Sequence, residues 1–142
     1  MSQLIVAEPR SGYRVSPPIV VDCSVLAAQL FEEPGRDEAG RILSGKALFA
    51  PWLIDHELVS VALKKAGAGL EGVAEQGLER LSRLRVTRRA TSRRGQWLLA
   101  QREGLSAYDA AYLQLAIELK APLATFDRTL GRVAERVLRG HG

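Results

Sequence analysis

The sequence predicts an α/β fold, a three-layer α/β/α sandwich around a central parallel sheet of four to five strands. Short apolar runs of strand length alternate along the chain with longer helical patterns, the order expected of a parallel sheet covered on both faces. No turn of the Asn-Gly kind joins two runs, so antiparallel hairpins are not indicated. With 142 residues, 46% of them hydrophobic, the chain suits one domain with its own core.

The first strand is predicted at the apolar run "IVVDCS", residues 19–24, and Ser24 offers an N-cap for the helix that follows. Three further strands are predicted at 47–51, where a proline ends "ALFAP", at 85–87 and at 122–126. Helical patterns fill the remaining segments, at 25–33, a short helix closing at Gly45, then 52–67, 70–84, 94–104, 106–120 and 128–136.

Two parts of the chain are distinguished by this pattern. Residues 1–18 precede it and form an arm of unclear role or an added edge strand, and residues 19–142 form the domain. No stretch approaches the roughly 20 apolar residues that a membrane-spanning helix needs, and the N-terminus lacks the features of a signal peptide. The single cysteine, Cys23, allows no internal disulfide and is expected to be a small buried residue. We therefore expect a cytoplasmic protein without membrane association.

The positive charge is concentrated in one segment, "RLSRLRVTRRATSRR", residues 80–94, which holds seven arginines and no acid. The net charge of the chain is +4, so the remainder is mildly acidic. A basic strip on an acidic body indicates a polyanionic partner. The alternative is an ordinary solvated, arginine-rich helix end and loop.

Four acidic residues invite a functional interpretation, although each has an ordinary explanation. Asp22 and Asp127 each end a predicted strand and precede a helix, so either is a normal N-cap. Ser106 and Asp109 have the S-x-x-D spacing of a capping box. Glu57 lies in a helix that is apolar nearly all round, where a single acid is most often partly exposed.

The helical wheel separates inward from outward acids. At about 100° per residue, Gln114 and Glu118 lie about 140° and 180° from Asp109, so Asp109 faces the protein, opposite the polar side of its helix. Asp55 lies about 160° from Glu57, so only one of these two can point into a given site.

Taken together, three or four of these acids, with Asp109 in the first turn of a helix that leads into one of the strands, indicate a metal site. Ligands of an open parallel α/β sheet bind beyond the carboxyl ends of the strands, and Asp22 and Asp127 follow two such ends. Carboxylates gathered there would raise each other's pKa. A hard divalent cation, Mg²⁺ or Mn²⁺, prefers oxygen ligands and removes that penalty.

At four places in order, the sequence resembles a PIN domain, the nuclease family that includes the VapC toxins of toxin–antitoxin pairs. The matching segments are "VVDCSVL", "LFAPWLIDHELVSVAL", "GLSAYDAAYLQLA" and "LATFD", within residues 19–133. Pro51 stands six residues before Glu57, as in the family. Two departures are Ser60, where many relatives have Asn, and the arm before Ile19.

The resemblance implies a PIN-like fold and a divalent-metal-dependent endoribonuclease that hydrolyses RNA phosphodiester bonds, the toxin of a pair with a cognate antitoxin. It assigns catalysis and metal binding to Asp22, Glu57, Asp109 and Asp127, with Ser24 and Thr125 supporting them. We expect RNA contacts from the basic segment, at Arg88, Arg89, Arg93 and Arg94. We also expect a homodimer, because two apolar helices are hard to bury in so small a domain. The alternative function is a catalytically idle RNA- or protein-binding module on the same fold, which would be expected to lack one of the acids.

Overall fold

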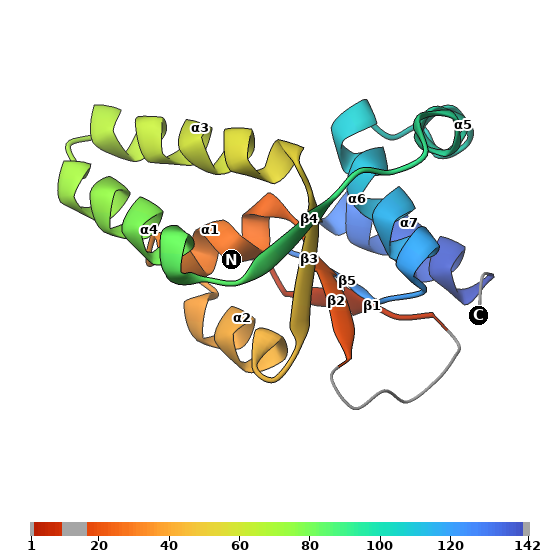
Figure 1. Cartoon of the computed structure of the whole chain (residues 1–142), viewed down its shortest axis with the longest axis horizontal. Coiled ribbons are helices and arrows are strands. Elements are labelled where there is room, and N and C mark those ends of the chain that lie inside the picture. The colour runs from red at the N-terminus through yellow and green to blue at the C-terminus, as the bar shows by residue number, and fades with distance from the viewer. Residues whose placement is uncertain (1, 10–16, 141–142) are drawn as a thin grey trace.

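The computed structural model of the chain describes residues 2–9 and 17–140, which form a five-stranded sheet between two layers of helices (Figure 1). Residues 10–16 of the predicted arm lie outside the described residues. The strands are β1 (Ile5–Ala7), β2 (Pro18–Val21), β3 (Ala47–Pro51), β4 (Val86–Arg89) and β5 (Leu123–Thr125).

The sheet has the strand order β1-β5-β2-β3-β4. The four strands β5, β2, β3 and β4 run parallel, which confirms the predicted parallel sheet. β1 adds an antiparallel edge strand beside β5, so the sheet is mixed. Of the two alternatives for the N-terminal segment, Ile5–Ala7 is the added edge strand.

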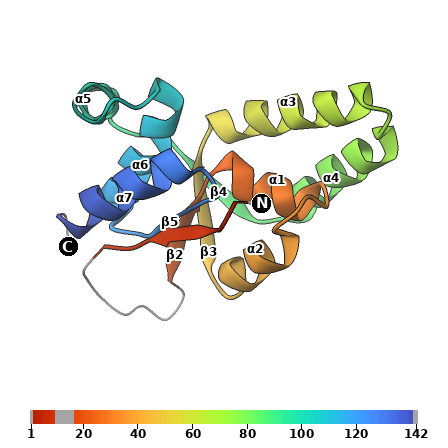
Figure 2. The same ribbon diagram turned by 180° about the vertical axis from the view of Figure 1, so that it is seen from behind.

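The helices lie in two layers, with α1 to α4 on one side of the sheet and α5 to α7 on the other (Figures 1 and 2). The three-layer prediction is confirmed. The helices are α1 (Cys23–Leu30), α2 (Arg36–Leu43), α3 (Leu53–Gly67), α4 (Glu71–Arg83), α5 (Arg93–Glu103), α6 (Ala107–Leu119) and α7 (Arg128–Arg139). Among the described residues, none of these helices combines the length and apolar character needed to span a bilayer.

The core consists mainly of fully buried aliphatic side chains from the central strands and the helices that cover them. β2 runs through its middle, with Ile19, Val20 and Val21 all at 0% exposure. The edge strand β1 packs on α7 through a close contact at Gly131, where a Cβ atom would lie 2.4 Å from Cδ1 of Ile5. The glycine is therefore what lets β1 approach α7 this closely.

One local prediction was wrong. The N-cap of α1 is Asp22, not Ser24, because the backbone N–H of Val25 donates to Oδ1 of Asp22. The helix therefore begins earlier than predicted, and Cys23 is its first residue rather than part of a strand. β4 also extends further than predicted, to Arg89.

Candidate active site

Four elements bring the predicted acids to one end of the sheet. β2 and β5 are adjacent and parallel, so Asp22 and Asp127 follow neighbouring strand ends. Asp109 lies in the first turn of α6, a helix that packs against β2, β3 and β5. Glu57 comes from the first part of α3, directly after β3. The carboxyl ends of the parallel strands are where an open α/β sheet binds its ligands.

Asp22 is the most buried of the four acids, with 6% of its surface exposed. One oxygen, Oδ1, accepts hydrogen bonds from the Ser24 hydroxyl at 2.6 Å and from the Val25 backbone N–H at 3.2 Å. The other oxygen, Oδ2, accepts a hydrogen bond from the Thr125 hydroxyl. These partners satisfy a buried carboxylate that would otherwise be costly to desolvate.

The two hydroxyl groups also hold the ends of β2 and β5 together. Oγ of Ser24 accepts the backbone N–H of Phe126 at 2.9 Å. Oγ1 of Thr125, which is fully buried, accepts the backbone N–H of Asp127 at 2.9 Å. Each hydroxyl therefore donates to Asp22 and accepts from the segment that follows β5. Ser24 and Thr125, which the family resemblance assigned a supporting role, both contact Asp22.

Asp127 and Ser106 have the capping roles that the sequence allowed. Asp127 is exposed, and its Oδ1 accepts the backbone N–H of Leu130 at 2.8 Å, which makes it the N-cap of α7. Ser106 caps α6 by accepting the backbone N–H of Asp109 at 3.0 Å. Capping by Ser106 uses the main chain of Asp109, and the Asp109 side chain is half-buried beside the other acids.

Glu57 has a partner that the sequence alone did not reveal. The Tyr112 hydroxyl donates to Oε1 of Glu57 at 2.5 Å, and Tyr112 is 2% exposed. Tyr112 lies three residues after Asp109, so both side chains share one face of α6. That spacing is the sequence signal that could have identified it. The pKa of the tyrosine is raised by burial and by Glu57, so it remains a proton donor in this bond.

The electrostatics make Asp109 the centre of the group. Burial raises the pKa of Asp22 to about 6, and the Asp109 charge adds to that rise. The pKa of Glu57 is raised by burial and, to a smaller extent, by Asp109, against the hydrogen bond from Tyr112. The pKa of Asp109 is raised by burial and then by Asp127, against the hydrogen bond from Ser106. Asp109 therefore interacts with each of the other three acids.

The donor set suits a hard divalent cation, because all four side chains offer carboxylate oxygens. They do not form a closed ligand shell: within residues 2–9 and 17–140, no three His, Cys, Asp or Glu side chains are grouped tightly enough to hold a metal ion. Asp22, Glu57 and Asp127 each direct one oxygen to a hydrogen-bond donor. The arrangement is an open cluster of mutually repelling acids.

Cys23 lies beside this cluster without the properties of a nucleophile. Burial, Glu57 and Asp22 raise the pKa of its thiol to about 12, so it stays protonated at neutral pH. It is partly buried and packs against the core, close to the small apolar role expected of it.

The four arginines predicted to contact RNA fall into two groups. Arg88, at the end of β4, makes a two-point ion pair with Asp55, at 2.6 Å and 3.0 Å. Its neighbour Arg89 lies over the ring of Phe49, 5.5 Å from the centroid. Arg93 and Arg94 begin α5 and are exposed. Asp55 thus points away from Glu57, as the helical wheel predicted, and is paired with Arg88.

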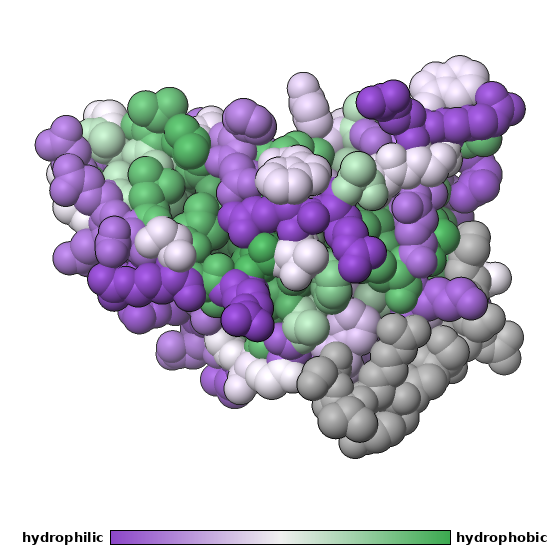
Figure 3. Space-filling model, in the orientation of Figure 1, coloured by the Kyte–Doolittle hydropathy of each residue, from purple (hydrophilic) through white to green (hydrophobic). Residues whose placement is uncertain are grey.

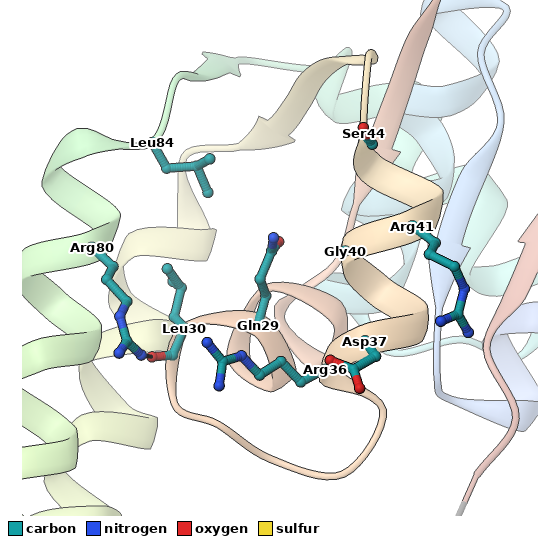
Figure 4. A pocket seen from close by; sticks show the side chains of 9 residues that line it. All are labelled: Gln29, Leu30, Arg36, Asp37, Gly40, Arg41, Ser44, Arg80 and Leu84. Carbon is teal, nitrogen blue, oxygen red and sulfur yellow. Dashed lines mark hydrogen bonds between the residues drawn. The ribbon is translucent and has the colours of Figure 1, made fainter.

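A pocket lies away from the acids, among α1, α2 and α4 (Figure 4). It encloses about 680 Å³ and is lined by Gln29, Leu30, Arg36, Asp37, Gly40, Arg41, Ser44, Arg80 and Leu84. The buried Oε1 of Gln29 has no hydrogen-bond partner among the residues that the structure describes. A pocket with no acid of the cluster in its lining is not the site of their chemistry.

Comparison with known proteins agrees with this geometry. The PIN domain family model matches residues 19–136. Ribonuclease VapC9 of Mycobacterium tuberculosis is 33% identical over 114 residues, which cover 79% of this chain and 87% of that protein. Ribonuclease VapC3 of Pyrobaculum aerophilum is 34% identical over 119 residues, which cover 79% and 91%. The crystal structure of PAE2754 from Pyrobaculum aerophilum has a TM-score of 0.65 at 23% identity, covering 87% of this chain and 95% of that one, and supports the fold.

Proposed function

The chain belongs to the PIN domain family, and we propose that it is a divalent-metal-dependent endoribonuclease that acts as the toxin of a toxin–antitoxin pair. The observation that carries the proposal is the position of Asp22, Glu57, Asp109 and Asp127 together at the carboxyl ends of the parallel strands. The alternative of an idle binding module has less support, because none of the four acids is missing.

In this mechanism Asp22, Asp109 and Asp127 would hold a divalent cation, Mg²⁺ or Mn²⁺. Such a cation would supply activation of a water molecule and neutralisation of charge on the scissile phosphate. Glu57 orients the water or a second cation, and Tyr112 fixes Glu57 for that task through its hydrogen bond. Ser24 and Thr125 keep Asp22 in one orientation. No side chain has to form a covalent intermediate.

The direct test is cleavage of a fluorescent single-stranded RNA by purified protein, free of antitoxin, with Mg²⁺, with excess EDTA, and with EDTA followed by excess Mn²⁺. We expect cleavage in the first and third conditions only. The matched control is the Asp109→Asn variant, which should be inactive in all three. Equal cleavage by the wild type in excess EDTA would overturn the metal mechanism.

We propose that Arg88, Arg89, Arg93 and Arg94 contact the RNA backbone. Each phosphate neutralised on a single strand adds about −0.7 to the slope of log affinity against log salt. Replacing all four with Gln should flatten that slope and weaken binding to every RNA sequence alike. Arg88→Gln alone should change it least, because Asp55 already neutralises that arginine. An unchanged slope in the fourfold variant would remove the basic segment from RNA binding.

A homodimer is the second part of the proposal, and the outer face of α3 supports it. Trp52, Val59 and Leu63 are 62%, 47% and 69% exposed, at spacings that align them along one side of the helix. Leu70 and Leu78 are exposed on and beside the neighbouring α4. Apolar surface gathers over these two helices, at the upper left of Figure 3. The Leu63→Asp variant should convert a dimer to a monomer in light scattering, whereas a wild-type monomer at micromolar concentration would exclude the dimer.

The cognate antitoxin is the third part, and the pocket of Figure 4 suits a peptide from it. Its lining combines Leu30 and Leu84 with Arg36 and Arg80, which share Glu32 as their acidic partner. Two cations that share one acid favour an acidic segment with apolar side chains. Arg36→Glu, at a side chain that extends into the cavity in Figure 4, should weaken capture by the co-expressed antitoxin without reducing RNA cleavage, and unchanged capture would assign the antitoxin to another surface. We propose that the protein meets its RNA substrate and its cognate antitoxin in the cytoplasm.

A further inference from the structure

The outward face of α5 combines one large aromatic side chain with two cations. Trp97 is 55% exposed. On the helical wheel Arg93 lies about 40° from Trp97 and Arg94 about 60°, so the three side chains share one face. No acid occurs anywhere in residues 80–102, which include this face. The face is therefore aromatic and basic at once.

The position of α5 on α6 is fixed, so the orientation of this face is fixed too. Nε2 of Gln96 donates to the carbonyl oxygen of Ala107 at 2.8 Å. The backbone N–H of Ser92 donates to Oε2 of Glu118 at 2.9 Å. Gly95 lies so close to α6 that a Cβ atom there would be 2.5 Å from Nε2 of Gln114. The inner side of α5 is thus occupied by α6, and Trp97 is left on the outer side.

The hydrogen bond between Gln96 and Ala107 joins α5 to the first turn of α6, which carries Asp109. Trp97 follows Gln96 in the sequence, and Tyr108 follows Ala107. Tyr108 is 66% exposed and immediately precedes Asp109. The two exposed aromatic residues therefore neighbour, in sequence, the pair of residues that joins α5 to the first turn of α6, and that turn also carries Asp109.

We propose that Trp97 and Tyr108 stack against bases of the RNA on one side of the scissile phosphate, and that they make the enzyme selective for single-stranded RNA. The inference rests on the ribonuclease function proposed above. Aromatic rings beside basic side chains are the common way to bind single strands, because every base offers a face for stacking. A base inside a duplex is stacked and paired, so it cannot reach such a ring.

The basic flanks favour RNA over a second copy of the chain. A dimer interface formed by this face would bring Arg93 and Arg94 of both copies close together without an acid in residues 80–102 to offset them. The apolar stripe of α3 has no comparable run of positive charge. The two exposed surfaces therefore have different occupants, RNA on α5 and a protein on α3.

The experiment measures the affinity of chelated, full-length protein for a short single-stranded RNA and for the duplex of the same sequence, by fluorescence anisotropy in EDTA. Trp97→Leu and Tyr108→Leu should each weaken single-strand binding about five- to tenfold. Duplex binding should stay within about twofold. Trp97→Phe should retain most of the affinity, because phenylalanine also stacks. Leu98→Ala, an exposed substitution on the same helix, is the matched control and should change neither value.

A spectroscopic readout separates stacking from a general loss of fold. In a Trp52→Phe background Trp97 is the single tryptophan of the chain, and its fluorescence should be quenched by single-stranded RNA but not by an abasic strand. The inference is wrong if Trp97→Leu leaves single-strand affinity unchanged, if both RNA forms weaken equally, or if the variant changes the oligomeric state instead. If the wild type cleaves no RNA with Mn²⁺, the proposed ribonuclease function is wrong. If the wild type cleaves RNA but Trp97→Leu and Tyr108→Leu bind single-stranded RNA normally, only the proposed stacking is wrong.

Discussion

Two junctions of the molecule, β2–α1 and β5–α7, have the same local design. The two strands are parallel neighbours, and each is followed by an aspartate that caps the next helix. Asp22 accepts the backbone N–H of Val25, and Asp127 accepts that of Leu130. An N-cap normally stabilises a helix by about 1 kcal/mol, so capping alone accounts for an aspartate at either position.

The two aspartates differ in their surroundings. Asp22 is 6% exposed at the centre of the sheet and accepts two further hydrogen bonds, from Ser24 and Thr125. Asp127 is exposed next to the edge of the sheet. Burial raises the pKa of Asp22 to about 6, which capping does not require. Asp22 and Asp127 have the same capping role, but the buried position of Asp22 at the centre of the sheet raises its pKa.

The largest effect is expected at Asp22. Asp22→Asn keeps the cap but removes the charge of a proposed metal ligand. RNA cleavage should therefore fall by more than the roughly 10- to 100-fold that is typical of losing an outer partner of a metal ligand. The same variant should be more stable than the wild type without metal near neutral pH. A pKa rise from 3.8 to about 6 corresponds to about 3 kcal/mol, from which loss of one hydrogen bond subtracts about 1 kcal/mol.

The sign of that stability change depends on pH. The folded-state pKa of Asp22 lies above its unfolded value, so ionisation of Asp22 costs stability as pH rises from about 4 through about 6. The advantage of Asp22→Asn should therefore be present above about pH 6 and absent below about pH 4. Urea unfolding of both proteins in EDTA across this range measures it. A variant that is less stable at every pH would show that Asp22 is chiefly a structural group.

Asp109→Asn should separate stability from activity in the same way, with a smaller change in the metal-free protein. Removing one charge relieves repulsion toward Asp127 and toward Asp22, so the apo variant should melt at or above the wild-type temperature near neutral pH. Mn²⁺ at a hundredfold excess over Kd should stabilise the wild type by about 2.7 kcal/mol and the variant far less. If the variant melts lower in EDTA and responds to Mn²⁺ as the wild type does, Asp109 is not a metal ligand.

The smallest stability effect is expected at Asp127, and a pair of substitutions isolates it. Asn is as good an N-cap as Asp, so Asp127→Asn should leave the free energy of unfolding within about 0.5 kcal/mol of wild type. Asp127→Ala should cost about 1 kcal/mol. Both variants should lose RNA cleavage to a similar extent, because both lose the carboxylate. Full activity in Asp127→Asn would reduce this residue to a cap.

Features encoded locally could be predicted from the sequence, and features made by distant contacts could not. The alternation of strands and helices and the placement of the four acids follow from short patterns. The hydrogen bond from Tyr112 to Glu57 and the ion pair of Arg88 with Asp55 join residues far apart in the chain. Such pairs become visible only once the helices are packed. The pairing of β1 with β5 was left open for the same reason, because a three-residue strand carries almost no periodicity.

The hydrogen bond between Asp22 and Thr125 joins groups 103 positions apart, so this end of the sheet cannot be completed until late in the synthesis of the domain. At about 5 to 20 residues per second, a ribosome adds Thr125 about 5 to 20 s after Asp22. Until then the emerging polypeptide lacks Asp127 and the β5 hydroxyl that orients Asp22. Unfinished copies therefore lack the complete group of four acids, so the proposed nuclease activity can appear only after residue 127 has been added.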